Sequence, residues 1–113
     1  MRDCIFCKIV AKKIPAELIR EAAEFIVIKD IQPKAPVHLL IIPKKHIPSM
    51  NEVTEADRQL LGQMLEEAKR LAVDYGLSGR GYKVVINCGR EGGQMVPHVH
   101  FHFLGGQMVP GLF

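Results

Sequence analysis

The sequence predicts an α+β fold: an antiparallel sheet of about five strands, with one long and one short helix. Apolar runs of strand length lie between turn residues, and one longer segment repeats apolar residues at steps of three and four. The connections between successive strands are short, which favours antiparallel pairing because a parallel pair needs a long crossover. The 113 residues suffice for one domain, which we expect to span residues 1–113.

The first part of the chain predicts a short helix and then three strands. Asp3 is expected to cap a helix that continues to about Lys12, since apolar residues recur there at helical spacing and Pro15 follows. Turn residues and prolines bound the strands, which we place at residues 17–20, 24–30 and 37–42.

The second part predicts the long helix and two more strands. Thr54 is expected to begin the helix, with Asp57 three residues later in a variant of the capping box. The apolar face continues to Tyr75, and Gly76 stands where a left-handed residue commonly ends a helix. Strands are expected at residues 82–87 and 99–104, with a glycine-rich loop at 89–94 between them.

Composition and charge exclude several classes of protein. Apolar residues make up 48% of the chain, enough for a packed core, yet no apolar run approaches the length of about 20 residues that spans a bilayer. No secretory leader is recognisable, so we expect a cytoplasmic protein without membrane contact. The net charge is only +3 and no basic stripe carries aromatic residues. Nucleic-acid binding is therefore not expected, whereas a small anionic ligand is compatible with the charge.

Cysteine usage indicates metal or redox chemistry. Three cysteines, an odd number, argue against a framework of disulfides. Cys4 and Cys7 form a C-x-x-C pair, which in a cytosolic chain indicates metal binding or a redox function. Cys88 stands apart from them, and we expect no role for it.

The segment from 98 to 104 carries the strongest chemical signal, because three of the five histidines fall within five residues. On a strand, alternate side chains point to opposite faces. His98, His100 and His102 would then share one face, while Val99 and Phe101 would lie on the other and enter the core. Histidine is uncommon, so a merely solvated strand face is the weaker interpretation.

Two chemical interpretations of this histidine row are open. Neighbouring imidazoles can share a Zn²⁺ ion, or a neutral imidazole can attack phosphorus or a carbonyl carbon. The loop before the row favours the second, since Gly89, Gly92 and Gly93 allow the backbone to turn its N–H groups toward an anion.

The row resembles the His-φ-His-φ-His-φ-φ signature of the histidine-triad (HIT) family. Other stretches are similar to the Hint branch of that family, in its bacterial zinc-bearing type, and the likeness covers nearly the whole chain. These stretches are residues 3–9, 30–31, 35–38, 42–47 and 104–106.

The resemblance implies a purine nucleoside phosphoramidase that works as a homodimer, with the sheet extended across the dimer. In that family the middle histidine attacks the α-phosphorus of a purine nucleotide, an amine leaves, and water hydrolyses the nucleotidyl-histidine intermediate. Carried onto this chain, His100 is the nucleophile, His102 contacts the phosphate and assists, and His38 packs beside the triad.

The same resemblance implies which residues bind the nucleotide. Asp30, with Ile31 beside it, matches the acidic residue that holds the ribose hydroxyls. Four apolar residues match the walls of the base pocket, namely Ile5, Phe6, Ile9 and Ile28. The phosphate pocket is implied at Asn87, Gly93, Gln94 and Met95.

The resemblance also implies a structural zinc site separate from catalysis. Cys4, Cys7, His46 and His98 form a Cys₂His₂ set, the composition of a closed tetrahedral site with no open position for a substrate. The alternative is that Cys4 and Cys7 are ordinary buried residues or a redox pair.

Two features depart from the Hint pattern. Met95 stands where a serine near the phosphate is common, and a thioether is a poor hydrogen-bond partner. The C-terminal segment is short and lacks tryptophan, which leaves the leaving-group preference open. Two alternative functions therefore stay in view: hydrolysis of dinucleoside polyphosphates, and a zinc-stabilised nucleotide-binding scaffold with vestigial activity.

Overall fold

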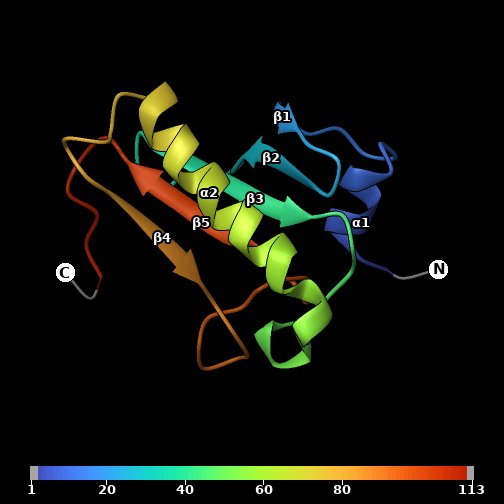
Figure 1. Cartoon of the computed structure of the whole chain (residues 1–113). Coiled ribbons are helices and arrows are strands. Elements are labelled where there is room, and N and C mark those ends of the chain that lie inside the picture. The colour runs from blue at the N-terminus through green and yellow to red at the C-terminus, as the bar shows by residue number, and fades with distance from the viewer. Residues whose placement is uncertain (1–2, 112–113) are drawn as a thin grey trace.

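The computed structural model describes residues 3–111, and residues 1, 2, 112 and 113 of the expected domain range lie outside the described residues. Five strands form one antiparallel sheet in the order β1-β2-β3-β5-β4, with the long helix α2 across one face (Figure 1). The predicted α+β class and the antiparallel pairing are confirmed. The elements are α1 (Ile5–Val10), β1 (Leu18–Glu21), β2 (Phe25–Lys29), β3 (Val37–Pro43), α2 (Arg58–Asp74), β4 (Tyr82–Ile86) and β5 (Phe101–Gly105).

The short helix α1 begins later and ends earlier than the sequence predicts. Its N-cap is Cys4, whose sulfur accepts the N–H of Cys7 at 3.4 Å, and not Asp3. The Asp3 carboxylate instead pairs with Lys8 at 3.1 Å. The helix stops at Val10 because Lys12, with φ of 61°, turns the chain into the left-handed region.

The long helix also begins later than expected, although its cap is the predicted one. Thr54 and Asp57 form the capping box, but residues 55–57 make a 3₁₀ turn and the α-helix begins at Arg58. The C-terminus follows the prediction, since Tyr75 caps the helix and Gly76 has φ of +69°. None of the described helices is long and apolar enough to cross a bilayer.

The last strand is shorter at its start than predicted. β5 begins at Phe101, so His98, Val99 and His100 precede it. The N–H of Val99 donates to the carbonyl of Ile47 at 2.7 Å, which ties this segment to the loop after β3 and not to the ladder of the sheet. Only His102 of the three histidines therefore lies on a strand. The four other strand predictions agree with the structure to within one residue at each end.

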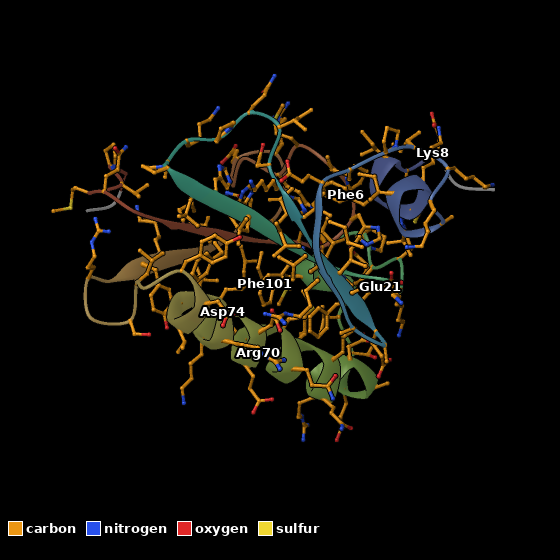
Figure 2. The ribbon with its side chains drawn as sticks, turned by 90° about the horizontal axis from the view of Figure 1, so that it is seen from above. Phe6, Lys8, Glu21, Arg70, Asp74 and Phe101 are labelled. Carbon is orange, nitrogen blue, oxygen red and sulfur yellow. The ribbon has the colours of Figure 1, made fainter. Side chains whose placement is uncertain are left out.

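The sheet separates two apolar clusters. Residues with odd numbers on β2, β3 and β5 face α2 and form the larger core, which includes Val27, Leu39, Ile41 and Phe103. Residues with even numbers on β2 and β3 face α1 and form a smaller cluster with Phe6. Figure 2 shows Phe101 between the sheet and α2, with Phe6 on the other side. The side chains of residues 100 and 102 fall on the Phe6 side, so the predicted alternation holds.

An ion-pair network ties the edge strand β1 to α2. The Nε of Arg20 donates to Glu67 at 2.6 Å, and its Nη2 donates to Asp74 at 2.7 Å. The Glu67 side chain is 2% exposed, and Nη1 of Arg70 lies 3.8 Å from its other oxygen. The network holds the larger core closed at the edge of the sheet, on the face away from the histidines.

Candidate active site and metal centre

The candidate active site lies at the start of β5, on the face of the sheet that carries α1. His100 is buried, and its ring centre lies 5.0 Å from that of His102. The edge of the Phe6 ring contacts His100, with centres 4.9 Å apart. Two imidazoles and one aromatic wall are thus brought together from α1, from the segment leading into β5 and from β5 itself.

Hydrogen bonding assigns the tautomer of His100. Its Nδ1 lies 2.7 Å from the carbonyl oxygen of His98. A carbonyl only accepts, so Nδ1 must carry the hydrogen and donate it. In the neutral ring the lone pair is then on Nε2, the nitrogen at the outer end of the side chain. This is the protonation state that a nucleophilic imidazole requires.

A chain of hydrogen bonds orients His102 through His38. The backbone N–H of Lys34 donates to Nδ1 of His38 at 3.0 Å, so the His38 hydrogen is on Nε2. That Nε2 lies 2.9 Å from Nδ1 of His102 and 3.2 Å from a carboxylate oxygen of Asp30. With Nδ1 of His102 accepting, its own hydrogen is on Nε2. Nε2 of His102 is therefore a hydrogen-bond donor, whereas Nε2 of His100 carries a lone pair.

All three rings are held neutral by their surroundings. Burial and, to a smaller extent, the neighbouring His100 and His38 together lower the pKa of His102 to about 4, against the opposing charge of Asp30. Burial likewise lowers the pKa of His100, and the hydrogen bond to His98 and the charge of Asp30 oppose this only in part. Burial also lowers the pKa of His38. The charge of Asp30 opposes this shift, and the charge of Lys34 adds to it. At neutral pH the site thus holds uncharged imidazoles.

The residues expected around the ribose and base do not share one environment. Asp30 follows β2, and its Oδ1 accepts the N–H of Gln32 at 2.8 Å, while Oδ2 faces His38. Ile31 beside it is 88% exposed. Phe6 and Ile28 are buried in the smaller cluster, and Ile9 packs partly buried against it. The structure therefore brings Asp30, Phe6, Ile9 and Ile28 to the histidine side of the sheet, whereas Ile31 points to solvent.

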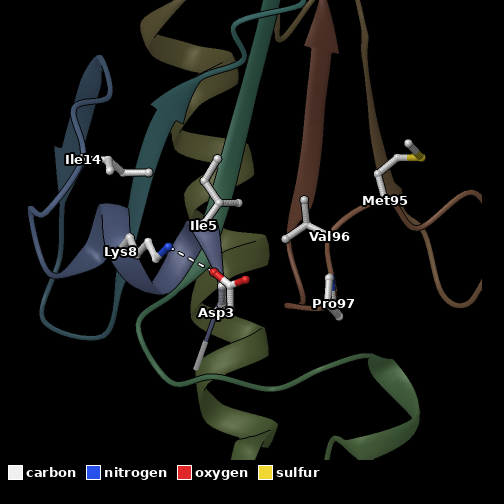
Figure 3. Close-up of a pocket in the computed structure, with 8 residues that line it drawn as sticks. Asp3, Ile5, Lys8, Ile14, Met95, Val96 and Pro97 are labelled. Atoms are coloured by element: carbon white, nitrogen blue, oxygen red, sulfur yellow. Dashed lines mark hydrogen bonds and ion pairs between the residues drawn. The ribbon is translucent and has the colours of Figure 1, made fainter. Parts of the chain in front are cut away.

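Ile5 lies elsewhere, on the rim of a shallow hollow of about 400 Å³ between α1 and the segment before β5. Figure 3 shows Ile5 and Lys8 on one side of this hollow and Val96 and Pro97 on the other. Met95 also lines it and is 88% exposed. Ile5 and Met95 thus border one opening, adjacent to the expected phosphate loop.

The glycine-rich loop is shaped by side-chain amides. Nδ2 of Asn87 donates to the carbonyl of Gly92 at 2.7 Å. Oε1 of Gln94 accepts the N–H of Gly89, and its Nε2 donates to the carbonyl of Pro48 at 2.7 Å and to that of Val96. Gln94 therefore fastens the loop internally and to the segment after β3.

Two loop glycines are required by geometry. Gly93 has φ of +82°, which L side chains rarely adopt, and a Cβ at Gly92 would lie 2.3 Å from the carbonyl oxygen of Cys88. The predicted loop is thus a tight turn built around backbone positions that only glycine fills.

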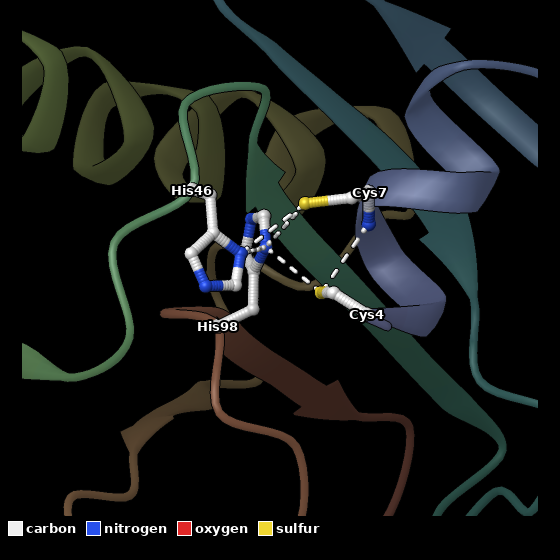
Figure 4. A group of neighbouring side chains, drawn as sticks. All are labelled: Cys4, Cys7, His46 and His98. Atoms are coloured by element: carbon white, nitrogen blue, oxygen red, sulfur yellow. Dashed lines mark hydrogen bonds between the residues drawn. The ribbon is translucent and has the colours of Figure 1, made fainter. Parts of the chain in front are cut away.

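Four donor atoms converge at the other end of the histidine segment (Figure 4). Nδ1 of His98 lies 3.4 Å from the Cys4 sulfur, 3.6 Å from the Cys7 sulfur and 3.2 Å from Nδ1 of His46. The Cys7 sulfur is 3.2 Å from Nδ1 of His46. All four atoms lie within 4.8 Å of one another, and Cys4 and His98 are buried.

These donors fit a tetrahedral metal ion. In a zinc site with ligand bonds of about 2.0–2.3 Å, the tetrahedral angle places neighbouring donors about 3.3–3.8 Å apart, close to the spacing found here. Nε2 of His98 donates to the carbonyl of Pro43 at 2.8 Å, which leaves the lone pair on Nδ1 inside the cluster. The predicted set Cys4, Cys7, His46 and His98 is thus brought together with a favourable tautomer.

Sequence reasoning missed the backbone groups that complete both sites. Lys34 donates its N–H to His38, while Pro43 and Pro48 accept from His98 and Gln94. Every residue except proline carries an N–H and every residue carries a C=O, so residue type gives no signal for these contacts. The prolines themselves mark only that the strand ends nearby.

Comparison with known proteins places the chain in a family. The family described as "Scavenger mRNA decapping enzyme C-term binding" matches residues 3–111. Protein HitA of Neisseria gonorrhoeae is 46% identical over 105 residues, covering 93% of this chain and 97% of its own.

Solved structures agree. A HIT family hydrolase from Legionella pneumophila is 47% identical with a TM-score of 0.93, covering 96% of each chain. A histidine triad nucleotide-binding protein from Candida albicans is 37% identical with a TM-score of 0.82, covering 89% of this chain and 73% of its own. The fold and the histidine row define a histidine-triad protein. The chain belongs to the HIT family.

Proposed function

We propose that this protein is a hydrolase that cleaves the P–N bond of purine nucleoside 5′-phosphoramidates through a nucleotidyl-histidine intermediate. The observation that carries the proposal is the tautomer of His100, whose Nδ1–H is held by the His98 carbonyl so that Nε2 keeps its lone pair. The likeness to a HIT family hydrolase and to a histidine triad nucleotide-binding protein supports the substrate class.

The reaction proceeds in two displacements at one phosphorus. Nε2 of His100 attacks phosphorus and forms a P–N bond, while the bond to the amine breaks and the amine takes up one proton. Water then attacks the same phosphorus, the bond to Nε2 breaks, and one proton is released as the nucleoside monophosphate leaves. An imidazole suits both steps because it is a good nucleophile and a good leaving group.

The neighbouring histidines stabilise the phosphoryl group. Nε2–H of His102 is the donor for a phosphoryl oxygen, and His38 holds His102 in that tautomer. Asp30 keeps acceptor capacity for the ribose hydroxyls beside its contacts to Gln32 and His38.

The remaining expected nucleotide residues take three roles in this proposal. Phe6, Ile9 and Ile28 line the base. Asn87, Gln94 and Gly93 shape the phosphate loop, Gln94 through its fastening of the turn. Ile5 and Met95 border the hollow beside this loop, where the leaving group departs, and Ile31 lies exposed next to Asp30 on the ribose side.

The proposal is tested with an adenosine phosphoramidate and the variant His100→Ala. Wild-type protein should release AMP and, when quenched during turnover, carry a mass increase of one adenylyl group mapped to His100. The variant should lose turnover by a factor of about 10⁴ or more while its circular dichroism is unchanged. Cys88→Ser, outside the described histidine and metal groups, is the matched control. Full activity of His100→Ala would remove His100 as the nucleophile.

Dinucleoside polyphosphate hydrolysis is the second candidate, because the same geometry cleaves a P–O bond. The family match to a decapping-enzyme domain favours it. Competition between an adenosine phosphoramidate and diadenosine tetraphosphate ranks the two leaving groups. Tight AMP binding with turnover no better than that of His100→Ala would favour the scaffold role instead.

We further propose a structural zinc ion at Cys4, Cys7, His46 and His98, which when bound cross-links α1 to the loops around β5. Elemental analysis of wild type and Cys4→Ser tests it, with one equivalent expected in the former and loss in the latter. A site closed by four protein ligands supplies stability and no catalytic position.

The same proposal includes a single domain that assembles as a homodimer. β4 is an edge strand of the sheet, and Tyr82 and Ile86 on it are large apolar side chains more than a third exposed. In this proposal the edge strand pairs with its counterpart in a second copy and extends the sheet. Sedimentation equilibrium of wild type and Ile86→Lys tests this, with a dimer expected only for the wild type.

A further inference from the structure

His98 takes part in two groups of residues at once. Its ring nitrogen Nδ1 is one of the four donors of the metal cluster. Its backbone carbonyl, attached to the same Cα as the side chain, accepts the Nδ1–H of His100 at 2.7 Å. The same residue therefore touches the candidate metal and sets the tautomer of the candidate nucleophile.

The position of His98 is set by the donor cluster on one side of its ring and by backbone groups around it. The side chain is fully buried, and its Nε2 donates to the Pro43 carbonyl at the end of β3. Its backbone N–H donates to the carbonyl of Val96 at 2.8 Å. His98 precedes β5, so no ladder of the sheet holds its carbonyl in place. The peptide unit that carries this carbonyl is held by the N–H of Val99, which donates to the carbonyl of Ile47 at 2.7 Å, and Ile47 directly follows the cluster residue His46.

A second contact joins the same two regions through α1. Cys4 caps this helix and Cys7 lies within it, so the cluster holds the helix against the sheet. Phe6 lies between the two cysteines in sequence and packs its ring edge against both His98 and His100, with centres 5.8 and 4.9 Å apart. The nucleophile is thus supported on its backbone side and on its ring side by elements that the cluster connects.

We propose that His98 is a positioning residue that couples occupancy of the metal centre to the tautomer and orientation of His100. This inference rests on the proposed function, since it concerns the nucleophile of that reaction. With the four donors joined, the His98 carbonyl holds the His100 hydrogen on Nδ1. With the donors separated, the carbonyl and Phe6 gain freedom, and His100 exchanges between its two tautomers. A ring with hydrogen on Nε2 has no lone pair there and does not attack phosphorus.

The experiment compares zinc-loaded wild type, the variant His46→Ala and the control Cys88→Ser. His46 lies on the loop after β3, and its Nδ1 contacts the Cys7 sulfur and Nδ1 of His98, so its loss removes a donor of the cluster and leaves the side chains of His98 and His100 in place. Two-bond ¹H–¹⁵N spectra of the histidine rings report the tautomer of His100 without any substrate. Steady-state kinetics with an adenosine phosphoramidate separate kcat from KM.

Zinc-loaded wild type and Cys88→Ser should show a single Nδ1–H tautomer for His100. His46→Ala should lose zinc and show averaged ring nitrogens for His100. Its kcat should fall about 10²-fold, the size of a misplaced reactive group, with KM changed less than about threefold. A single Nδ1–H tautomer and an undiminished kcat in zinc-free His46→Ala would overturn the coupling.

A conservative variant separates coupling from general damage. His46→Cys retains a ligand atom for zinc. When loaded, it should restore both the single tautomer and the kcat, even where His46→Ala is too unstable to measure. Averaged His100 nitrogens in zinc-loaded, folded His46→Cys would also overturn the inference. The spectra remain decisive if wild type hydrolyses no phosphoramidate, so failure of the proposed function and failure of the coupling are distinguished.

Discussion

The two faces of the sheet come from the same strands and have opposite chemistry. On the face toward α2, Phe103 and its neighbours form a core of apolar side chains, with the ring of Tyr82 stacked on Phe103. On the other face, the adjacent residue His102 takes part in a chain of hydrogen bonds that runs back to Lys34. Phe103, which stabilises the fold, and His102, which belongs to the candidate active site, are therefore neighbours in sequence. The comparison teaches that each face can be altered without removing the other.

Phe103→Ala should produce the largest effect, and it should fall on stability. The side chain is fully buried, so its truncation leaves a cavity and should lower the free energy of unfolding by about 3–5 kcal/mol. Urea denaturation followed by circular dichroism measures it. Val73→Ala, on the exposed side of α2, is the control and should cost less than about 0.5 kcal/mol. Equal losses for both would refute the division between the faces.

His102→Asn should lower the catalytic rate and leave stability nearly unchanged. It removes the donor that faces the phosphoryl group, so kcat should fall about 10²–10⁴-fold. The free energy of unfolding should change by less than about 1 kcal/mol, because the neutral amide keeps hydrogen-bonding capacity toward His38. Stopped-flow release of AMP and urea denaturation give the two values. A variant that loses stability but keeps its rate would place His102 with the core.

Glu67→Gln tests whether the α2 side depends on its ion pair. The buried carboxylate has Arg20 as its partner, and the amide leaves that guanidinium with a weaker acceptor. The expected loss is about 1–3 kcal/mol of unfolding free energy with unchanged kcat. The pKa of Arg20 is raised chiefly by its hydrogen bond to Glu67, but a guanidinium is charged at neutral pH even without that partner, so the arginine stays charged in the variant. The double variant with Arg20→Met should recover part of the loss.

The pH dependence of stability separates the faces further. A histidine in the unfolded chain binds a proton below about pH 6.5, whereas folded His102 stays neutral down to its pKa of about 4. The unfolded state therefore binds more protons in this window. The free energy of unfolding should fall as pH drops from about 6.5 to about 4 and should not fall further on this account below it. Denaturation at several pH values should give a shallower slope for His102→Asn than for wild type.

The smallest effect is expected from Gln94→Ala. It removes three hydrogen bonds that fasten the glycine-rich loop, at a position that is itself half-buried. KM for the phosphoramidate should rise about tenfold, while the free energy of unfolding falls by no more than about 1 kcal/mol. Gln94→Glu keeps the acceptor for Gly89 but sets a carboxylate against the carbonyls of Pro48 and Val96, so its KM should rise at least as much as that of Gln94→Ala. An unchanged KM in both variants would show that the loop keeps its shape without this residue.

Much of the fold was predictable because its signals are local. The strands of residues 25–29 and 37–43 lie between turn residues, and the long helix shows its period directly, so their positions were predicted to within a few residues. The ends were less predictable. Cys4 replaced Asp3 as the cap of α1 because its sulfur is held at the donor cluster, which no local pattern describes.

The candidate site divides in the same way. The donor set of the metal centre and the histidine row could be named from residue type, since few residues bind metals or act as nucleophiles. The start of β5 could not be predicted. Residues 98–100 precede the strand because Val99 hydrogen-bonds to the loop at Ile47 and not to a neighbouring strand. The sequence also could not show that Ile31 and Ile5 are exposed while Phe6 and Ile28 are buried, because all four residues are apolar.

The sequence by itself determined which chemical groups are present and, through the alternation along the last strand, which of them share a face. Only the tertiary structure decided which nitrogen of each ring holds its hydrogen. Those assignments come from the carbonyls of His98 and Pro43 and the N–H of Lys34. Backbone groups are nearly the same in every residue, so their effect on a side chain depends on where the folded chain places them.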